Sequence, residues 1–478
     1  DDGRVHVTRN DGDRWQDVTP GGLPEWAQVN SIDIHPFERG GAYVAATGYK
    51  SDDFRPYLFR TTDWGKSWQE ITDGIPTDEF TRVVRADPDR RGLLYAGTEK
   101  AIYYSLDDGK SWSSLQLNLP VSPITDLAIK EKELIVATQG RGYWILDDLN
   151  VLHQIGPEAT AADAHLYAPR DSYRLTAGGR SENPVNAGTN PPIGVVLHYA
   201  LAAEPSPDTE ITLSVYEDRS AEPIWTWTRE LESDEEEETE SSPNDPPDLA
   251  LLSTEQGLNR FVWDLRYPGM ERFDDLIMWA DMREGPKAVP GTYRAELTVG
   301  STVRDVEFEI LADPRSTSSG ADYRAQFDFI IDTRNLLSRA HGEVRKIRKL
   351  RGQLEALQVR LEVDAESDSR VADLLEEVSL LIDTVTPIEE SIYQTQNESR
   401  QDPLNYPVRL NNKLTSLMRT VDVGESRPTR GAEGVRDELS AALESEPQLI
   451  DDVWTQHVPA LNSEIQAMGI DLVSISDE

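Results

Sequence analysis

The stretch SLDDGKSW, Ser105 to Trp112, decides the fold of the first third of this chain because it recurs. It returns as TTDWGKSW at Thr61 to Trp68 and, more loosely, as TRNDGDRW at Thr8 to Trp15. Each copy follows a short apolar run that is typical of a β-strand, so the motif is predicted to form a hairpin turn. The recurrent residues are therefore interpreted as structural parts of a repeat.

Each residue type in the motif suits a turn. The acid, Asp63 or Asp107, can accept hydrogen bonds from backbone amides two residues on, and the glycine supplies a positive φ. The tryptophan begins the next strand and covers the turn with a large ring. Across the three copies the structural residues are Asn10, Gly12, Trp15, Asp63, Gly65, Trp68, Asp107, Gly109 and Trp112.

The spacing of the motif predicts the repeat unit. Trp15 and Trp68 are 53 residues apart, and Trp68 and Trp112 are 44 apart, which matches the roughly 40–50 residues of a four-stranded propeller blade. A last unit, from Glu133 to Leu149, has strand patterns without the motif. Residues 1–150 are therefore predicted to form a partial β-propeller of about three and a half blades that do not close a ring.

Composition limits the classes of function. The 478 residues include 87 Asp plus Glu against 47 Lys plus Arg, a net charge of -40, which argues against nucleic acid and anionic membranes as partners. The chain has no cysteine, which excludes disulfides and thiolate metal sites. No apolar run approaches the ~18 residues that span a bilayer. The acidic surface, with ten lysines, is one expected of a protein kept soluble in high salt.

The motifs carry a resemblance to a known family. The S/T-x-D-x-G-x-S-W repeats are Asp boxes, and together with ATQGRGYWILDDL and QDPLNYPVRLNNKL they resemble the BNR-repeat propellers of the sortilin (VPS10) type. That type occurs in large exported bacterial proteins that are often labelled glycosyl-hydrolase-like. Two residues depart from the pattern: Asn10 replaces the usual Asp of the first box, which predicts a weaker turn, and Gln139 stands where the resemblance implies His.

The resemblance also implies a location and a partner. Because the first box follows a single short strand, the chain is expected to be the C-terminal portion of a longer protein. Its signal peptide and further propeller blades would then lie upstream, and those blades would be its partners within the same chain. The expected location is extracellular or periplasmic.

The rest of the chain is predicted to change from β to α, which gives a multidomain, mainly β then α protein. Residues 151–190 have many breakers and are interpreted as a connector. Residues 191–315 show alternating strands of an immunoglobulin- or fibronectin-like β-sandwich, interrupted by an acidic loop at 232–248. Residues 320–470 are predicted to form an antiparallel helical bundle, interrupted at Pro387, Pro447 and Pro459.

Two features of the helical region leave alternatives open. A heptad-like stripe fits the core of the bundle, or an intermolecular coiled coil; it consists of Ile347, Leu350, Leu354, Leu357 and Leu361. The asparagines of QDPLNYPVRLNNKL, residues 401–414, fit helix caps or bonds between helices, or else ligand binding.

Candidate chemistry is sparse. Seven histidines without cysteine make a zinc cluster improbable, and we expect no metal and no cofactor. A glycosidase needs two facing carboxylates, and the candidates beside aromatic residues are Asp52, Asp53, Asp147 and Asp148. Aromatic rings that could stack on a ligand, with one cation that could face the channel or pair with a carboxylate, are Tyr49, Tyr57, Arg141, Tyr143 and Trp144. Solvated acids beside packing aromatics are the alternative.

Two functions remain open from the sequence. In the first, the chain is a binding module for an extracellular protein, peptide or polysaccharide. In the second, it is a glycoside hydrolase of the BNR-repeat type whose site lies partly in upstream blades. No catalytic constellation stands out in the sequence, which favours the first function.

Overall fold

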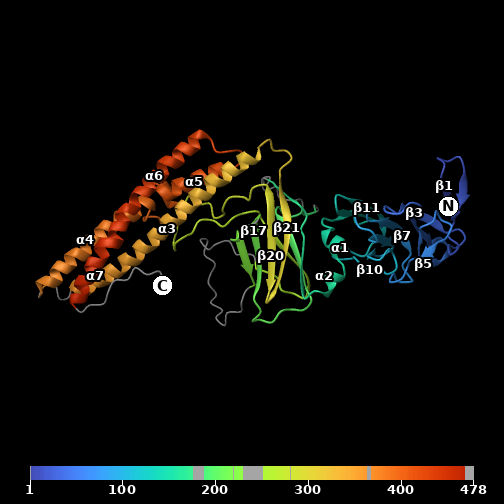
Figure 1. Ribbon diagram of the computed structural model, residues 1–478, viewed down its shortest axis with the longest axis horizontal. Coiled ribbons are helices and arrows are strands. Elements are labelled where there is room, and N and C mark those ends of the chain that lie inside the picture. The colour runs from blue at the N-terminus through green and yellow to red at the C-terminus, as the bar shows by residue number, and fades with distance from the viewer. Residues whose placement is uncertain are drawn as a thin grey trace. The chain divides into compact units, whose positions relative to one another are not determined.

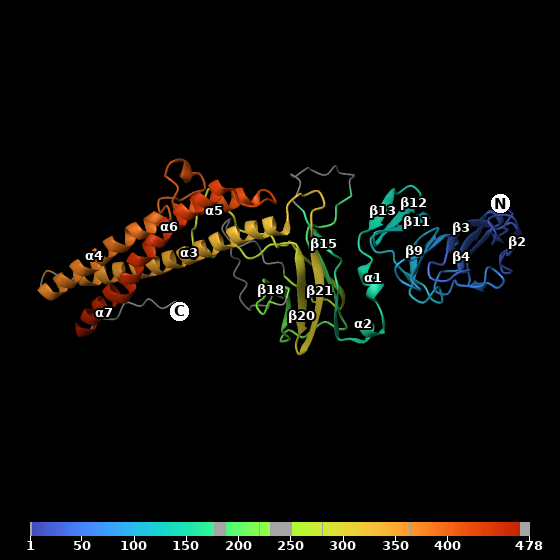
Figure 2. The ribbon, with the colours of Figure 1, turned by 45° about the horizontal axis from the view of Figure 1, so that its top comes forward.

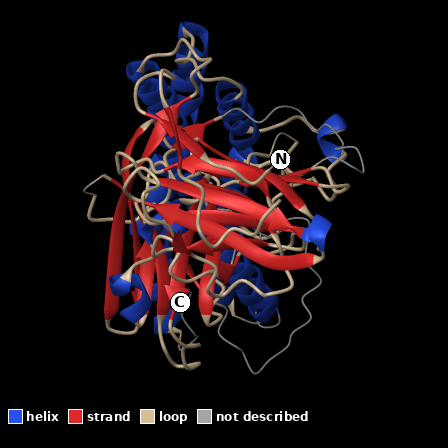
Figure 3. Ribbon diagram, turned by 90° about the vertical axis from the view of Figure 1, so that its right-hand side faces the viewer, coloured by secondary structure: helices blue, strands red, loops and turns tan. Residues whose placement is uncertain are grey.

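The computed structural model describes residues 2–175, 188–218, 220–229, 251–279, 281–362, 366 and 368–468, and the side chains of 444–451 lie outside this description. The architecture is mixed, with several small sheets followed by a helical C-terminal region (Figure 3). The chain divides into two compact units, residues 1–162 and 163–478. The predicted acidic loop at 232–248 lies outside the described residues.

The N-terminal unit contains four antiparallel sheets (Figure 1), in which strands adjacent in sequence are paired: β1-β2, β3-β4-β5-β6, β7-β8-β9-β10 and β11-β12-β13. A four-stranded meander of this kind is the unit from which β-propellers are built. The strands are β1 (His6–Thr8), β2 (Trp15–Asp17), β3 (Gln28–Ile34), β4 (Ala42–Gly48), β5 (Asp53–Thr61), β6 (Gln69–Glu70), β7 (Thr81–Ala86), β8 (Leu94–Thr98), β9 (Ile102–Ser105), β10 (Ser113–Ser114), β11 (Ile124–Lys130), β12 (Glu133–Thr138) and β13 (Tyr143–Leu146). A 3₁₀ turn, η1 (Tyr49–Ser51), and two short helices, α1 (Asn150–Gln154) and α2 (Pro157–Ala161), complete the unit.

The first strands of neighbouring sheets run in the same direction. The Ser31 hydroxyl donates to the Val84 carbonyl at 3.3 Å, and the Ala86 amide donates to Asp33 Oδ2 at 2.7 Å. The step from Ser31 to Asp33 along β3 therefore corresponds to the step from Val84 to Ala86 along β7. Each of β3, β7 and β11 also has a register shift near its start. Since every sheet is an antiparallel meander, the β4–β5, β8–β9 and β12–β13 loops lie at one end of the sheets and the motif turns at the other.

The motif turns are held by hydrogen bonds from the amide four residues after the acid, and not two residues after it as we expected. Ser67 N–H donates to Asp63 Oδ1 and Ser111 N–H to Asp107 Oδ1, both at 2.9 Å. The serine hydroxyls add bonds to the second carboxylate oxygen at 2.8 and 2.7 Å. Asn10 accepts the equivalent amide at 3.0 Å, but its turn lacks the hydroxyl bond because Arg14 occupies the serine position.

The motif also links one sheet to the preceding one. Trp68 Nε1 donates to the Val18 carbonyl at 2.6 Å, and Trp112 Nε1 donates to the Ile71 carbonyl at 2.7 Å. The motif glycine explains the close approach: at Gly109, where φ is 87°, an added Cβ would lie 2.6 Å from the Ile71 side chain. Gly65 approaches Val18 in the same way. The repeated glycine and tryptophan therefore connect neighbouring sheets as well as shaping the turns.

The second unit begins with two sheets that share one hydrophobic core. A three-stranded sheet has the order β14-β16-β19 and a five-stranded sheet the order β15-β21-β20-β17-β18, with β15 parallel to β21. The strands are β14 (Ala164–Tyr167), β15 (Ser172–Arg174), β16 (Val195–Leu201), β17 (Ile211–Glu217), β18 (Trp225–Thr228), β19 (Gly257–Trp263), β20 (Gly291–Val299) and β21 (Thr302–Ala312). An immunoglobulin-like topology stays a prediction.

The segment expected as a connector, residues 151–190, contributes to these sheets. β14 pairs with β16 and β15 with β21, so the sheets begin before residue 191. Both strands are short, and the bulky residues of β14 have no period-2 alternation long enough to predict a strand. The division between the units falls at residues 162 and 163, inside the expected connector.

The helical region packs around the predicted stripe. Ile347, Leu350, Leu354, Leu357 and Leu361 are all buried, in a cluster that includes side chains of α4 and α7, and Figure 2 shows these helices side by side with α3. Helix α4 continues through Pro387 and α6 through residue 447, so the interruptions predicted there are wrong. The helices are α3 (Gly320–Glu362), α4 (Ser369–Ile392), α5 (Leu410–Asp422), α6 (Arg430–Asp452) and α7 (Val458–Ala467), with a 3₁₀ turn η2 (Asp402–Leu404) and a π-helical turn (Val453–His457).

A long segment between β19 and β20, residues 264–287, packs against the helices. An isolated bridge between Arg266 and Lys287 closes its base. Beyond this bridge, apolar side chains of the segment enter a core formed with α3, α4, α5 and α6; they are Met270, Phe273, Leu276, Met278 and Met282. The segment therefore joins the two-sheet region to the helices within the second unit.

Candidate functional site

The loop end of the N-terminal sheets carries an aromatic stack. Tyr49, in η1, stacks on Phe80, which precedes β7, with ring centroids 4.9 Å apart and an interplanar angle of 14°. Phe54 lies 6.2 Å from Phe80, and the Arg82 guanidinium lies 5.2 Å from the Phe80 ring. Phe54 is 49% exposed, whereas Phe80 is buried. We call Tyr49, Phe54, Phe80 and Arg82, with the β4–β5, β8–β9 and β12–β13 loops, the rim.

Asp53 at the rim is held as an ion pair. Arg55 Nε donates to Asp53 Oδ1 at 2.9 Å, Arg55 Nη2 donates to Oδ2 at 2.8 Å, and the Tyr57 hydroxyl donates to Oδ2 at 2.5 Å. The Arg55 hydrogen bonds lower the pKa of Asp53, and burial together with the bond to Asp53 raises the pKa of Tyr57 to about 12. Both oxygens of Asp53 are therefore engaged, and the carboxyl group stays ionised, which does not suit a general acid.

Asp52 forms part of the turn before β5. Its φ is 58°, in the left-handed region that Asp tolerates better than most residues, and its amide donates to the Tyr49 carbonyl at 3.1 Å. This conformation turns the chain from η1 into β5 and brings Tyr49 to the level of Phe80. Asp52 and Asp53 thus shape the loop that presents the aromatic rings.

Fixed ion pairs continue the rim on the β7-β8-β9-β10 sheet. Arg82 Nε donates to Glu99 Oε2 at 2.6 Å, and Lys100 Nζ pairs with Asp78 Oδ2 at 2.6 Å. Glu79, which is buried, accepts the hydroxyl groups of Thr98 and Tyr103, each at 3.0 Å. These bonds hold the β8–β9 loop and the segment before β7 in one place, so the Arg82 guanidinium over Phe80 is preorganised.

The third loop of the rim contains Arg141 between two glycines with positive φ, Gly140 and Gly142. The Arg141 amide donates to Thr138 Oγ1 at 3.2 Å and its carbonyl accepts Trp144 Nε1 at 3.1 Å, so the tryptophan packs on the loop. Tyr143 is 81% exposed. Arg141 is exposed as well. The backbone N–H of Gln139, which stands where His was expected, donates to the Pro123 carbonyl at 2.9 Å.

Asp147 and Asp148 lie at the other end of the β11-β12-β13 sheet. Both follow β13, which runs away from the β12–β13 loop. Asp148 Oδ1 accepts the Asn150 amide at 2.8 Å at the start of α1. The two acidic pairs predicted as catalytic candidates are therefore at opposite ends of the sheets, and the structure does not bring them together.

Two buried polar clusters at the end of the sheets opposite the rim were not predicted. His35 stacks on Tyr43, and Asp108 accepts the Tyr43 hydroxyl and pairs with Arg60. In the next repeat, Asp87 occupies the position of His35. It accepts the Tyr95 hydroxyl at 3.1 Å and lies 2.9 Å from His153 Nε2. Each cluster joins one sheet to the next element, so these acids and histidines are structural contacts. Equivalent His-Pro and Asp-Pro pairs at 35–36 and 87–88 were the available signal.

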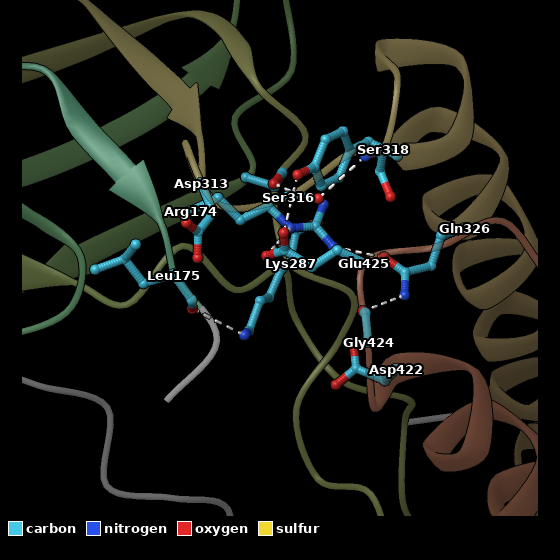
Figure 4. Close-up of polar contacts among 12 residues, drawn as sticks. Arg174, Leu175, Lys287, Asp313, Ser316, Ser318, Gln326, Asp422, Gly424 and Glu425 are labelled. Carbon is cyan, nitrogen blue, oxygen red and sulfur yellow. Dashed lines mark hydrogen bonds and ion pairs between the residues drawn. The ribbon is translucent and has the colours of Figure 1, made fainter. Parts of the chain in front are cut away.

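The second unit has its own buried charged cluster, between the sheets and the helices (Figure 4). Arg174 of β15 donates to Gln326 of α3 at 2.6 Å, and its guanidinium lies 3.9 Å from Glu425 and 4.9 Å from the Tyr323 ring. Lys287 donates to the Leu175 carbonyl at 3.3 Å. Burial lowers the pKa of both Arg174 and Lys287. The cluster joins elements of the fold and supplies no nucleophile.

No group of three or more potential metal ligands is present in the described parts of the chain. Among the same residues, none of the helices is both long and apolar enough to cross a membrane.

Sequence reasoning missed several rim residues. Tyr49 and Tyr57 were predicted, but Tyr57 is buried against Asp53. The residue that stacks on Tyr49, Phe80, was not identified. Phe54 and Arg82 were also missed. The signal in the sequence was local: Phe54 stands at the start of β5 and Phe80 just before the start of β7, both at the loop end of the sheets. That Tyr49 and Phe80, 31 positions apart, are in contact depends on how neighbouring sheets pack.

Comparisons with known proteins do not identify a family. No protein-family model matches this chain. No curated protein matches it either. Solved structures with similar parts include YCF48 bound to D1 peptide, which is 22% identical over 30% of this chain and 46% of its own, with a TM-score of 0.25. YCF48 from Cyanidioschyzon merolae is 20% identical over 31% of this chain and 48% of its own, with a TM-score of 0.24.

A glycoside hydrolase is also among the similar structures. The GH74 xyloglucanase from Xanthomonas campestris is 14% identical over 64% of this chain and 40% of its own, with a TM-score of 0.22. The matched part of this chain spans less than half the length of each of these three proteins. These identities and TM-scores are too low to transfer a function to this chain.

Proposed function

We propose that this chain is part of an exported protein that acts by binding, and that the rim contacts an extracellular protein, peptide or polysaccharide. We further propose that the N-terminal unit belongs to an Asp-box propeller of the sortilin type. Support for the propeller comes from the repeated four-stranded meanders, the parallel first strands and the motif tryptophans that bond to the preceding sheet.

The aromatic stack carries the proposal of binding. An exposed Phe54 beside the stacked Tyr49 and Phe80 rings offers an apolar surface. Fixed charges surround it, because Asp53 and Arg82 are each held in ion pairs. Aromatic residues and arginine are the types that contribute most to binding at protein surfaces. Preorganised side chains also lose little conformational entropy when a ligand binds.

Glycoside hydrolysis is the second candidate. It would require a second carboxylate about 5–9.5 Å from the first across a ligand groove. Asp53 directly precedes Phe54 of the aromatic stack, and Arg55 and Tyr57 occupy its oxygens. A nucleophile or base in this environment would first have to exchange those partners. The geometry of the rim therefore supports binding better than hydrolysis.

The test measures binding and hydrolysis together. The full chain is incubated with a panel of polysaccharides and unstructured peptides, and both capture and release of reducing ends are recorded. Phe54→Ala is expected to weaken capture at least about tenfold, as loss of a hot-spot residue does. Phe37→Ala is the matched control, because Phe37 is an exposed phenylalanine, 40% exposed, in the β3–β4 loop at the opposite end of the same sheet.

Two results would contradict the binding proposal. If Phe54→Ala and Phe37→Ala weaken capture equally, the rim is not the site. If reducing ends are released and substitution of Asp52, Asp53, Asp147 or Asp148 by Asn abolishes the release, the chain is a hydrolase. Release that survives all four substitutions would indicate a contaminating activity and leaves the capture result to decide.

A further inference from the structure

An arginine-lined pocket lies in the second unit, far along the chain from the rim residues. Its volume is about 360 Å³, within the range of small-ligand sites. The lining residues are Met278, Trp279, Asp281, Arg283, Arg400 and Arg419. Three guanidinium groups and one carboxylate give the pocket a formal charge of +2, in a chain whose net charge is -40. An anionic ligand that most of the surface repels can be held here.

Three segments build the pocket and fix its shape. The first is the 264–287 segment, where the Trp279 amide donates to Asn412 Oδ1 of α5 at 2.9 Å. Asn412, Thr415 and Arg419 follow one face of α5, at positions i, i+3 and i+7. Thr415 contacts the Met278 sulfur at 3.8 Å. The same helix face that anchors Met278 and Trp279 therefore brings Arg419 to the pocket.

The loop before α5 supplies Arg400. Asp402 Oδ2 accepts the amides of Glu398 and Ser399, both at 2.7 Å, which closes a tight turn around Arg400. Asn397 Nδ2 donates to the Ile277 carbonyl at 3.4 Å, which ties this turn to the 264–287 segment. Arg400 is thus carried by a loop with a defined conformation, and the pocket is formed before any ligand binds.

The acid in the pocket is already shared between arginines. Arg272 Nη1 donates to Asp281 Oδ1 at 2.8 Å, and Arg283 Nε lies 3.4 Å from Asp281 Oδ2. Each carboxylate oxygen has two acceptor sites, so Asp281 can still accept a ligand hydroxyl group. Arg400 and Arg419, both exposed, present planar forks that match the two oxygens of a carboxylate.

Trp279 gives the pocket an apolar face. Its side chain is 54% exposed although its backbone is anchored by Asn412. An exposed indole on an anchored backbone offers a flat surface for a ring with C–H groups on one face. A ligand that combines a ring of this kind, hydroxyl groups and a carboxylate would use Trp279, Asp281 and the arginines together. A phosphate ion would use only the arginines, and an apolar peptide side chain would leave the remaining acceptor sites of Asp281 unused.

We propose that this pocket binds a uronic acid, either free or as a unit of an acidic polysaccharide. The carboxylate pairs with Arg400 and Arg419, the sugar ring lies on Trp279, and a hydroxyl group donates to Asp281. The inference does not depend on the rim, because every residue it uses belongs to the second unit.

The experiment measures binding of the full chain by calorimetry. The probes are galacturonate, glucuronate and mannuronate, each as a monomer and as a tetramer, and the fully methyl-esterified tetramers. The acids are expected to bind and the esters are not, because esterification removes the charge and keeps the ring. Raising NaCl from 20 to 200 mM is expected to weaken binding, since salt screens exposed charges. Comparison of monomer with tetramer distinguishes a free sugar acid from a polymer as the source.

Variants place the ligand in the pocket. Arg400→Gln and Arg419→Gln are each expected to weaken binding at least about tenfold, as loss of a charge-assisted hydrogen bond does, and Trp279→Ala is expected to weaken it similarly. Arg360→Gln is the matched control: it is exposed on α3, and the 19 residues that separate it from His341, which contacts α5, span about 28 Å of helix. Since Arg400 and Arg419 are exposed, melting temperatures should be unchanged, which confirms folding.

Several results would overturn the proposal. The first is equal binding of the acids and their esters, and the second is binding that Arg400→Gln and Arg419→Gln leave unchanged. The third is a loss of binding in Arg360→Gln that is as large as in the two pocket variants. Two further results would do so with other probes: binding of inorganic phosphate with the affinity of the uronates, or binding of an acidic peptide when no uronate binds. Failure of every probe to bind at millimolar concentration would also refute it. None of these results bears on the capture measured with Phe54→Ala at the rim.

Discussion

Asp107 shows how much of a turn a single carboxylate determines. Its Oδ1 accepts the Ser111 amide, and its two oxygens bond the hydroxyl groups of Ser105 and Ser111 at 2.8 and 2.7 Å. These hydrogen bonds lower the pKa of Asp107 despite its partial burial. The natural copy at Asn10 retains the amide bond at 3.0 Å and lacks a serine partner.

Asp107→Ala is expected to lower the free energy of unfolding by about 1–2 kcal/mol, because two to three hydrogen bonds of modest net value are lost. Asp107→Asn should cost less, since the amide oxygen still accepts from Ser111, as it does in the first copy. Urea denaturation of both variants checks the order. An Asn variant as unstable as the Ala variant would show that the charge, and not the acceptor, stabilises the turn.

His341 is a buried histidine whose neutral form fits its surroundings. Its Nδ1 lies 2.7 Å from the Glu271 carbonyl, and Asn411 Nδ2 lies 3.3 Å from its Nε2, so one nitrogen donates and the other accepts. Burial, with nearby Arg272 and Arg345, lowers the pKa of His341 to about 4. Asn411 thus bonds to a neighbouring helix. A bond between helices was one of the alternatives predicted for the asparagines of this segment.

Stability should therefore depend on the pH between about 6.5 and 4. Above this window, His341 is neutral in both states, and within it the unfolded chain binds a proton that the folded chain does not, so stability falls as the pH falls. The contribution is about 2 kcal/mol between pH 7.5 and 5. His341→Gln should remove this part of the pH dependence, measured by urea denaturation at both pH values. Equal losses in the variant and the parent would contradict the assignment to His341.

Local residue chemistry was predictable where the partners are close in sequence. The acids and glycines of the motif could be assigned to turns because a positive φ and a short acceptor are needed there. The pairing of Asp53 with Arg55 was also accessible, since residues i and i+2 share one face of a strand. The contact of Tyr49 with Phe80 was not, because it depends on the packing of two sheets.

At the scale of elements, the second unit depends on a buried joint between β15 and α3. The Arg174 side chain is 3% exposed and contacts Gln326, Glu425 and the Tyr323 ring. A buried charge of this kind is stabilising only together with its partners. The sheets, the 264–287 segment and the helices should therefore lose stability together when Arg174 is removed.

Arg174→Leu is expected to lower the free energy of unfolding by about 3–5 kcal/mol, because Glu425 would remain buried without its cation. Arg315→Gln is the control: Arg315 also pairs with a carboxylate, Asp313, but its side chain is 74% exposed, so little measurable change is expected. Differential scanning calorimetry should show the loss in the transition of the second unit. A loss spread equally over all transitions would mean that Arg174 supports more than this joint.

The elements themselves were predictable where the sequence period is long. The stripe from Ile347 to Leu361 indicated a helix over about four turns, and its burial against α4 and α7 favours the core of a bundle over an intermolecular seam. β14 and β15 were missed because three or four residues do not establish a period. Pro387 was misinterpreted because a proline within a helix costs about 3 kcal/mol, and the packing of Val385 and Ile388 on both sides of it offsets that cost.

For the whole molecule, the change of the hydrophobic period from two to about 3.6 predicted the change from β to α, but not where the units divide. The division at residues 162 and 163 depends on which sheet β14 joins, and strand pairing between segments some 30 residues apart leaves no local pattern. The pocket lined by Arg283, Arg400 and Arg419 could not be predicted for the same reason. Its residues come from three segments that only the packing of the 264–287 segment brings together.

Net charge makes the last prediction a property of the whole molecule. If each of the 47 basic residues paired with an acid, 40 acids would still lack a partner, so repulsion outweighs attraction. The Debye length falls from about 30 Å at 0.01 M salt to about 3 Å at 1 M, which removes most of that repulsion between exposed side chains. The urea midpoint should therefore rise between 10 mM and 1 M NaCl.

The slope of the denaturation curve and a neutral osmolyte distinguish screening from other causes. The m-value should stay constant, because salt changes the stability and not the surface that unfolding exposes. Sucrose of equal osmolality stabilises by exclusion from the protein surface. A rise of the urea midpoint in NaCl that exceeds the rise in sucrose is therefore due to screening of the charges. A midpoint that falls with salt would mean that ion pairs such as Arg351 with Glu389, 2.5 Å apart, stabilise the fold by more than the excess acids destabilise it.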